Sequence, residues 1–255
     1  MPFIPLHDEN PRLLIRWPWV TWGLMLGCVL IHALVTFADP EAQNRIFLAL
    51  GFIPALLSGN VVLPDGYSIV PAWVTLLSYQ FLHGGWAHLG GNMLFLWVFG
   101  DNIEDALGHL RFIIFFLLSG VIGGLAHYAI APHSEITLIG ASGAVSGILA
   151  AYLLLHPKAR VWIPIVIVPV FLPAWLLLIG WFGLQLFQGI LSSDLSNVAW
   201  WAHIGGFVAG IPLYFLLRRR GTPLFGQQDL PSGITLRDAA RRKRWEGRKQ
   251  AGPWE

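Results

Sequence analysis

Six apolar segments, several of them shorter or longer than the length that crosses a bilayer comfortably, constrain the fold of this chain more than any other feature. Their approximate bounds are Trp17–Phe37, Trp86–Gly100, Phe112–Ala131, Ser142–Leu155, Val161–Ile190 and Ala199–Leu217. The composition agrees, because only 12% of the residues are charged, against roughly 25% in soluble domains. About 20 apolar residues span a membrane as a helix. The sequence therefore predicts an all-α membrane protein with a bundle of six transmembrane helices.

Positive charges predict how these segments are oriented. If six spans alternate, the Lys and Arg residues between and beside them fall on one side of the membrane: Arg12, Arg16, Arg111, Lys158, Arg160 and Arg218–Arg220. Only Arg45 falls on the other side. Because cytoplasmic loops carry the excess of Lys and Arg, both termini are expected in the cytoplasm. The N-terminus, with three prolines and two acids before the first long apolar run, does not resemble a cleaved signal peptide, and we expect a multi-pass protein of a bacterial inner membrane.

The chain divides into three parts by composition. Residues 1–16 form a short N-terminal segment, residues 17–217 the membrane domain, and residues 218–255 a basic tail. The long, mostly uncharged stretch 38–85 contains Pro54, Pro64 and Pro71 and is expected to be a folded first loop, partly embedded in the membrane. The tail is expected to act as a positive anchor at the membrane surface, with specific lipid or partner contact as the alternative.

Polar residues in three of the apolar segments are predicted to lie at one depth. Ser142 begins a segment of only about 14 residues, or roughly 21 Å of helix, against a hydrocarbon core of roughly 30 Å. His203 precedes Arg218 by 15 residues and His88 precedes Asp101 by 13, which places both roughly 20 Å above the cytoplasmic face. Ionisable and polar residues inside a membrane are costly and usually functional.

Their chemistry predicts a catalytic site. Ser142 lies where a helix begins, so its free backbone N–H can face a developing negative charge, and Gly143 leaves the approach open. A serine needs an adjacent base to become a good nucleophile, and His203 can supply it. His88 and Asn92 are spaced i, i+4 and share a helix face, from which both can donate hydrogen bonds to an oxyanion.

No acid is placed to complete a triad. Asp101, Glu104 and Asp105 lie at the opposite end of the second segment, about 20 Å from His88, and Asp194 could reach only by folding back from a loop. A Ser–His dyad is therefore expected.

Small residues favour close contact between the fourth and sixth segments. Ala202, Gly206 and Gly210 form a stripe at four-residue spacing, and Gly143 and Gly147 can form its counterpart. Such stripes allow transmembrane helices to approach closely, as a hydrogen bond between Ser142 and His203 requires.

Each of these residues alone would more often serve helix packing, and only their conjunction favours catalysis. Ser146 also precedes a glycine but lies one turn deeper, so we assign it to packing. His83 is expected to be a loop residue near the site, and His32 and His127 packing residues. No metal site is expected, because the chain has no His-Glu-x-x-His motif and its single cysteine, Cys28, cannot join a Cys-rich set. No cofactor is expected.

Three motifs together resemble those of the rhomboid intramembrane serine proteases: Gly-Ala-Ser-Gly at 140–143, Ala-His-x-x-Gly-x-x-x-Gly at 202–210, and His-x-x-x-Asn at 88–92. The resemblance covers about residues 70–217. It implies a six-helix core with Ser142 as nucleophile and His203 as general base. It also implies that His88, Asn92 and the Ser142 backbone N–H stabilise the oxyanion.

The resemblance further implies the substrates: single-pass transmembrane proteins, cut near the outer end of their helix within the lipid bilayer, with no nucleic-acid partner. It makes the region from Val161 to Ser196 the mobile side that admits substrate, where Pro164, Pro169 and Pro173 would interrupt helical hydrogen bonding.

Two positions depart from the family pattern. Trp73-Val74-Thr75 stands where many members have a Trp-Arg pair, and Ser146 stands where some have a tyrosine that stacks on the histidine. Trp200 or Trp201 could position His203 instead.

Two other functions remain open from the sequence. One is a non-catalytic rhomboid-like binder or chaperone of membrane proteins, and the other is a transporter. Retention of both serine and histidine favours the enzyme over the first. The absence of charged or repeated intramembrane groups disfavours the second.

Overall fold

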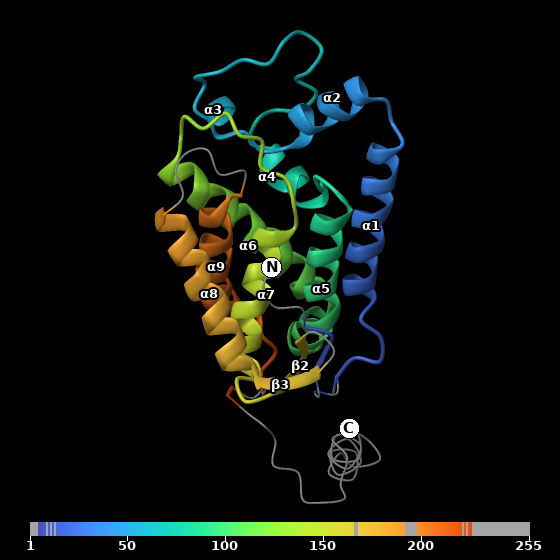
Figure 1. Cartoon of the computed structure of the whole chain (residues 1–255), viewed down its shortest axis with the longest axis vertical. Coiled ribbons are helices and arrows are strands. Elements are labelled where there is room, and N and C mark those ends of the chain that lie inside the picture. Colours follow the sequence, from blue (N-terminus) through green and yellow to red (C-terminus); the bar gives the residue numbers. More distant parts are fainter. Residues whose placement is uncertain are drawn as a thin grey trace, which may run out of the picture.

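The long helices of the described residues run side by side along the longest axis of the protein (Figure 1). The computed structural model describes residues 5–8, 10, 12, 14–165, 168–191, 198–220, 222 and 224–225, without the side chains of 164–169. The long helices are α1 (Trp19–Thr36), α5 (Trp86–Leu107), α6 (His109–Ile130), α7 (Ser142–Leu155), α8 (Ala174–Leu191) and α9 (Trp200–Leu217). This confirms the predicted all-α bundle.

The outward faces of the bundle are apolar, as lipid requires. Leu34, near the end of α1, is 75% exposed, and exposed large apolar side chains also stand on α6, α8 and α9. In the described part of the chain, α1, α6, α8 and α9 are long and apolar enough to cross a membrane, and α7 is a shorter apolar helix. The protein is therefore an integral membrane protein, while the count of six spans stays a prediction.

Helices α6, α7 and α9 form the centre of the bundle, in contact with one another along their lengths. Phe112, Phe116, Ile148 and Tyr214 are fully buried among them. Close packing of this kind gives each side chain many dispersion contacts, so these three helices provide a rigid base for any site formed at their ends.

The first loop covers one end of the bundle, which we call the loop end (Figure 1). It contains α2 (Pro40–Leu50), α3 (Pro54–Leu57), α4 (Thr75–Ser78) and the 3₁₀ turn η1 (Tyr79–Phe81). Helix α2 begins because Asp39 accepts a hydrogen bond from the Ala42 N–H at 2.9 Å, a typical N-cap. Phe52 and Leu138 exchange both backbone hydrogen bonds, at 3.0 and 2.7 Å. The loop is thereby fastened to the segment that leads into α7.

The fifth predicted span, Val161–Ile190, is wrong in its N-terminal part, residues 161–173. Residues there form an antiparallel hairpin of β2 (Arg160–Ile165) and β3 (Val168–Pro173), and α8 begins only at Ala174. Prolines at 164, 169 and 173 cannot continue a helix, and the many β-branched residues between them favour strands. The hairpin lies at the end opposite α2 and α3 (Figure 1). We call this end of the bundle the basic end and define it by Arg111, Lys158, Arg160 and Arg218.

The second predicted span, Trp86–Gly100, extends about two further turns, to Leu107. The acidic residues in this extension form hydrogen bonds with the N-terminal segment and the start of α1. Asp105 accepts hydrogen bonds from the N–H groups of Leu14 and Ile15 at 2.7 and 2.6 Å. Glu104 is fully buried and accepts from the N–H and hydroxyl of Thr21 at 2.7 and 2.6 Å. These carboxylates are therefore engaged in holding the start of α1.

A short strand, β1 (His7–Asp8), completes a three-stranded sheet by pairing with β2. Asp8 is buried and accepts hydrogen bonds from the Tyr152 hydroxyl at 2.6 Å and from Asn102 at 3.1 Å. Burial raises the pKa of Asp8 above its ordinary value, although the bond from Tyr152 opposes the rise. The N-terminal segment is thus packed onto the basic end of the bundle.

Candidate active site

Helix α7 begins at a sharp turn of the backbone. Gly140 has φ +124°, a conformation that glycine alone adopts readily, and its N–H donates to the Tyr79 carbonyl at 2.9 Å. A Cβ added at Gly140 would lie 2.7 Å from Nε2 of His88. The turn therefore brings the His88 ring directly over the backbone and starts the helix at Ser142.

Ser142 and His203 lie within hydrogen-bonding distance. The Ser142 Oγ is 2.7 Å from Nε2 of His203, although the two residues are 61 positions apart in α7 and α9. His203 is buried. This is the separation expected between a serine nucleophile and its base.

The small residues on α7 and α9 allow this contact. A Cβ on Gly206 would clash with the carbonyl of Gly143, and one on Gly210 would lie 2.7 Å from the Cα of Gly147. The Ala202 carbonyl would lie 3.4 Å from a Cβ on Gly143. The structure thus brings the five small residues together in one helix contact, directly below Ser142 and His203.

A residue not identified from the sequence, Gln185 of α8, holds the other side of His203. Its Oε1 lies 2.8 Å from Nδ1 of His203, and the side chain is buried. A carbonyl oxygen only accepts hydrogen bonds, so Nδ1 carries the proton. Nε2 is then left as an acceptor facing Ser142. The available signal was a glutamine inside an apolar span, but no partner for it could be identified from the sequence alone.

Two tryptophans also contact the histidine ring. Trp200 packs edge-on at 6.0 Å between ring centroids, and Trp181 lies tilted at 6.3 Å. Trp201 instead packs toward Gly189 of α8, 3.7 Å from the position of an added Cβ. Of the two tryptophans considered from the sequence, Trp200 is the one placed beside the ring.

His88 and Asn92 both lie next to Gly140, two residues before the serine. Nδ2 of Asn92 would be 3.7 Å from a Cβ on Gly140 and donates to the His88 carbonyl at 3.2 Å. An amide nitrogen has two protons, so one remains to donate elsewhere. The N–H of Ser142, in the first turn of α7, has no acceptor within the helix. Two side chains of α5 thus lie beside the turn that leads into Ser142, and His88 lines the same cavity as Ser142.

A cavity of about 660 Å³ opens over these groups. Ser142, His203, Gln185 and His88 line it, together with apolar residues such as Ile139 and Trp181. It is large enough for several residues of an extended peptide and combines an apolar wall with a few polar groups, as ligand sites commonly do.

The remaining candidates take other positions. The Ser146 hydroxyl is fully buried and donates to the Ser142 carbonyl at 2.6 Å. His127 lines the cavity, and His32 contacts the His83 carbonyl through Nδ1 at 3.1 Å. His83 is 1% exposed and packs against His88 at 5.3 Å between rings. Its burial, with the positive charge that His88 would carry, lowers the pKa of His83 to about 4.

The acids stand apart from the site. Asp101, Glu104 and Asp105 occupy the basic end of α5, where they bind the N-terminal segment and Arg12, and Asp194 lies outside the described residues. In the part of the chain that the structure describes, no group of three or more His, Cys, Asp or Glu residues is arranged to hold a metal ion.

Comparison with known proteins agrees with this geometry. The family model of the Rhomboid domain matches residues 71–220, which include all the site residues above. The chain is 28% identical to the "Putative rhomboid protease YdcA" of Bacillus subtilis over 83% of its own length and 94% of that protein.

Two further relatives match over smaller parts. Identity is 31% to the "Rhomboid protease GluP" of Bacillus subtilis, over 60% of the chain and 27% of that protein. It is 34% to the "Rhomboid-like protein 11, chloroplastic" of Arabidopsis thaliana, over 33% of the chain and 30% of that protein. The chain thus spans under a third of the length of these two relatives and nearly all of the first. It belongs to the Rhomboid family.

Proposed function

We propose that this protein is an intramembrane serine endopeptidase that works through a Ser142–His203 dyad and an acyl-enzyme. The observation that carries the proposal is the chain of contacts from Gln185 through His203 to Ser142, at 2.8 and 2.7 Å. With the Nδ1 proton directed at Gln185, Nε2 can accept the serine proton, as the proposed mechanism requires. Relatives named as rhomboid proteases support the same reaction.

In this mechanism Nε2 of His203 takes the Ser142 proton as Oγ attacks the carbonyl carbon of the scissile bond. The carbonyl oxygen becomes an oxyanion, stabilised by the Ser142 N–H and by side-chain donors from His88 and Asn92. The tetrahedral intermediate collapses when His203 protonates the leaving amine. Water then attacks the acyl carbon, His203 takes its proton, and Ser142 leaves as the hydroxyl.

The substrates are proposed to be single-pass transmembrane proteins. A peptide carbonyl inside a helix is hydrogen-bonded and shielded, so the scissile segment must unwind before it can enter the cavity. A cut near the end of a transmembrane helix, where helix-weakening residues occur, meets this need. Helix α8, which lines the cavity through Gln185 and Trp181, is the proposed side of entry.

The proposed orientation follows from charge. The basic end carries Arg111, Lys158, Arg160 and Arg218, so the positive-inside rule places it and both termini in the cytoplasm of a bacterium. The cavity, at the loop end, then opens to the outer side of the inner membrane.

Cleavage of a transmembrane substrate tests the proposal. Purified wild type, Ser142→Ala and Ser146→Ala are reconstituted in vesicles with a fluorescent single-span substrate that has small residues before the cut. Wild type and Ser146→Ala are expected to cleave, while Ser142→Ala is inactive. If Ser142→Ala binds the substrate as wild type does and no variant cleaves it, the protein is a binder rather than a protease.

A further inference from the structure

The basic end contains a second cavity, far from the proposed catalytic groups. It is an open hollow of about 1440 Å³ between the junction of α5 and α6 and the end of α9. Four arginines line it: Arg111, Arg218, Arg219 and Arg220. Among the lining residues that the structure describes there is no Asp or Glu. The hollow is therefore strongly positive.

These four guanidinium groups have no acidic partner among the described residues. Within the described ranges, no carboxylate lies within ion-pair distance of any of them, and the ion pairs there involve Arg12 and His109 instead. The two acids of α5 that precede the hollow in sequence are already engaged: Glu104 is bound by His109 and by the start of α1, and Asp105 accepts from the N-terminal segment. Four cations gathered without an acid repel one another, so an anion in the hollow would relieve that repulsion.

The backbone fixes the arginines in place. The Arg219 N–H donates to the Ala106 carbonyl at 3.1 Å, and its guanidinium lies over Gly108, where any Cβ would collide with it. Gly108 has φ +82°, so glycine is required there on two counts. Arg218 donates to the Thr222 carbonyl at 3.3 Å and stacks over Phe215 at 5.5 Å. The hollow is thus held in shape by the ends of two helices.

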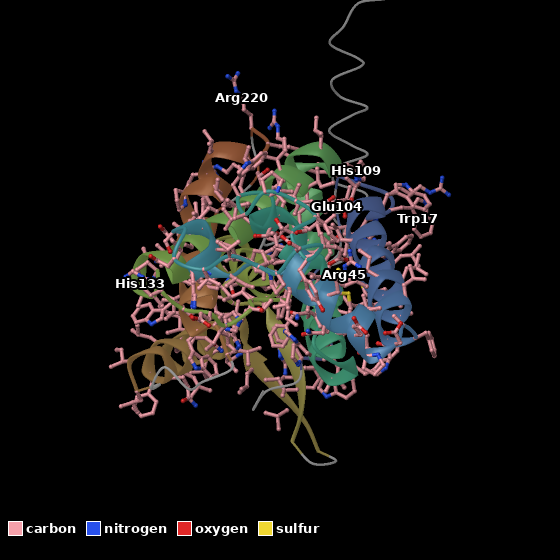
Figure 2. The ribbon with its side chains drawn as sticks, turned by 90° about the horizontal axis from the view of Figure 1, so that it is seen from above. Trp17, Arg45, Glu104, His109, His133 and Arg220 are labelled. Carbon is pink, nitrogen blue, oxygen red and sulfur yellow. The ribbon has the colours of Figure 1, made fainter. Side chains whose placement is uncertain are left out.

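The wall below the arginines is apolar and faces outward. Leu110 and Leu216 line the hollow and are 73% and 77% exposed, and both belong to helices long and apolar enough to span a membrane. Arg220 extends outward beyond the ribbon at the end of α9 (Figure 2). A ligand here would meet guanidinium groups at one end and hydrocarbon-facing side chains at the other.

We infer that this hollow binds the phosphodiester headgroup of an anionic phospholipid, with its acyl chains along Leu110, Leu216 and Phe215. Planar guanidinium groups bind phosphate oxygens in pairs, which accounts for the four arginines. The exposed leucines account for a lipid rather than a free anion. The site is independent of the proposed protease activity.

Native mass spectrometry of the detergent-solubilised full chain tests the inference. The protein is titrated with dioleoylphosphatidylglycerol and, separately, with dioleoylphosphatidylcholine, which has the same chains but no net charge. Each arginine near a headgroup contributes about fivefold in affinity. Wild type is therefore expected to prefer the anionic lipid by roughly 25-fold for every two arginines that reach the headgroup, and Arg111→Gln/Arg219→Gln to reduce that preference by roughly 25-fold.

The matched control is Arg16→Gln. Arg16 lies over the Trp17 ring at 5.7 Å, outside the hollow and beside α1, where Figure 2 shows Trp17 at the edge of the molecule. This variant is expected to keep the wild-type preference. Equal preference for the two lipids in the wild type, or an equal loss in Arg16→Gln, would overturn the inference.

Two further arms keep the test decisive. If the double glutamine variant does not fold, Arg220→Gln removes one charge at the rim of the hollow. Its affinity for the anionic lipid is expected to be about fivefold lower than that of wild type. An unchanged affinity would overturn the assignment. Inorganic phosphate at the same concentration is expected not to displace the lipid. Displacement would show that the hollow binds free phosphate and that the lipid assignment is wrong.

Discussion

At the scale of single residues, the site depends on how one imidazole is held. His203 lies within hydrogen-bonding distance of Gln185 through Nδ1 and of Ser142 through Nε2. The Trp200 ring packs edge-on against it. Ser142, His203, His88 and Asn92 could be picked out from the sequence because polar groups in apolar spans are rare. Gln185 could not be assigned a role, because its partner lies 18 residues away on another helix.

Replacing Gln185 is expected to slow catalysis rather than weaken substrate binding. Gln185→Leu leaves Nδ1 without an acceptor, so the proton can move to Nε2 and block the base; kcat should fall about 10- to 100-fold, part of what general base catalysis contributes, with KM little changed. Gln185→Glu keeps an acceptor at Nδ1 and should retain most of the rate. Steady-state cleavage of the fluorescent substrate measures both, and equal losses would contradict the orienting role.

His83 is expected to make stability depend on pH. Its pKa is lowered to about 4, below the ordinary value of 6.5, so between these values the unfolded chain binds more protons than the folded one. The contribution of His83 to the free energy of unfolding is therefore fully present above pH 6.5. It is lost as the pH falls toward 4, which lowers the free energy of unfolding by about 3 kcal/mol at most. Thermal unfolding in detergent between pH 7.5 and 4.5 should show a smaller decline for His83→Gln. If His83→Gln lost stability with falling pH as much as wild type does, His83 would not be the cause of the decline.

At the scale of helices and strands, the bounds of an element could be predicted where glycine or proline marks its ends. Helix α7 runs from Ser142 to Leu155 as predicted, because Gly140 starts it and Pro157 follows it. The hairpin 160–173 was missed because a continuous apolar run does not distinguish a buried strand from a helix. The extension of α5 to Leu107 was missed because its three acids look like a helix end until their partners on the N-terminal segment are known.

The contact between α7 and α9 predicts a steric effect of one methyl group. Gly206→Ala would push a Cβ into the Gly143 backbone, separating the helices that carry Ser142 and His203. A displacement of about 1 Å can lower the rate about 100-fold, and overpacking costs about 1–3 kcal/mol of stability. Activity and unfolding temperature should both fall.

Gly183→Ala is the matched control, because nothing lies within 4 Å of the added Cβ on α8. It should keep activity and raise the unfolding temperature slightly, since alanine favours a helix over glycine. If both alanine variants behaved alike, close approach of α7 and α9 would not be the reason for the glycine at 206.

At the scale of the whole molecule, we propose that charge and hydropathy together determine how the bundle lies in the membrane. The loop end carries Arg45 and the basic end carries the other described cations of the helix ends, so the bundle has a strong charge asymmetry. That asymmetry, together with the apolar outward faces, could be read from the sequence. The arrangement of helices that turns scattered polar residues into one cavity could not, because it depends on glycine contacts between distant segments.

The orientation can be measured with single cysteines. Cys28, the only cysteine, is buried and is replaced by serine. Asp65→Cys at the loop end should then react with a membrane-impermeant maleimide on intact bacteria, and Lys158→Cys at the basic end only after lysis. Labelling in the reverse order would contradict the proposed topology, and equal labelling of both on intact cells would do so too.

The central claim, that Ser142 is a nucleophile activated by His203, is tested most directly by active-site labelling. The detergent-solubilised wild type is treated with a fluorophosphonate, digested, and mapped by mass spectrometry, alongside Ser146→Ala and His203→Ala. The account predicts one adduct, on Ser142, in wild type and in Ser146→Ala, with labelling lost in His203→Ala. An adduct on Ser146, or labelling of Ser142 that does not depend on His203, would contradict it.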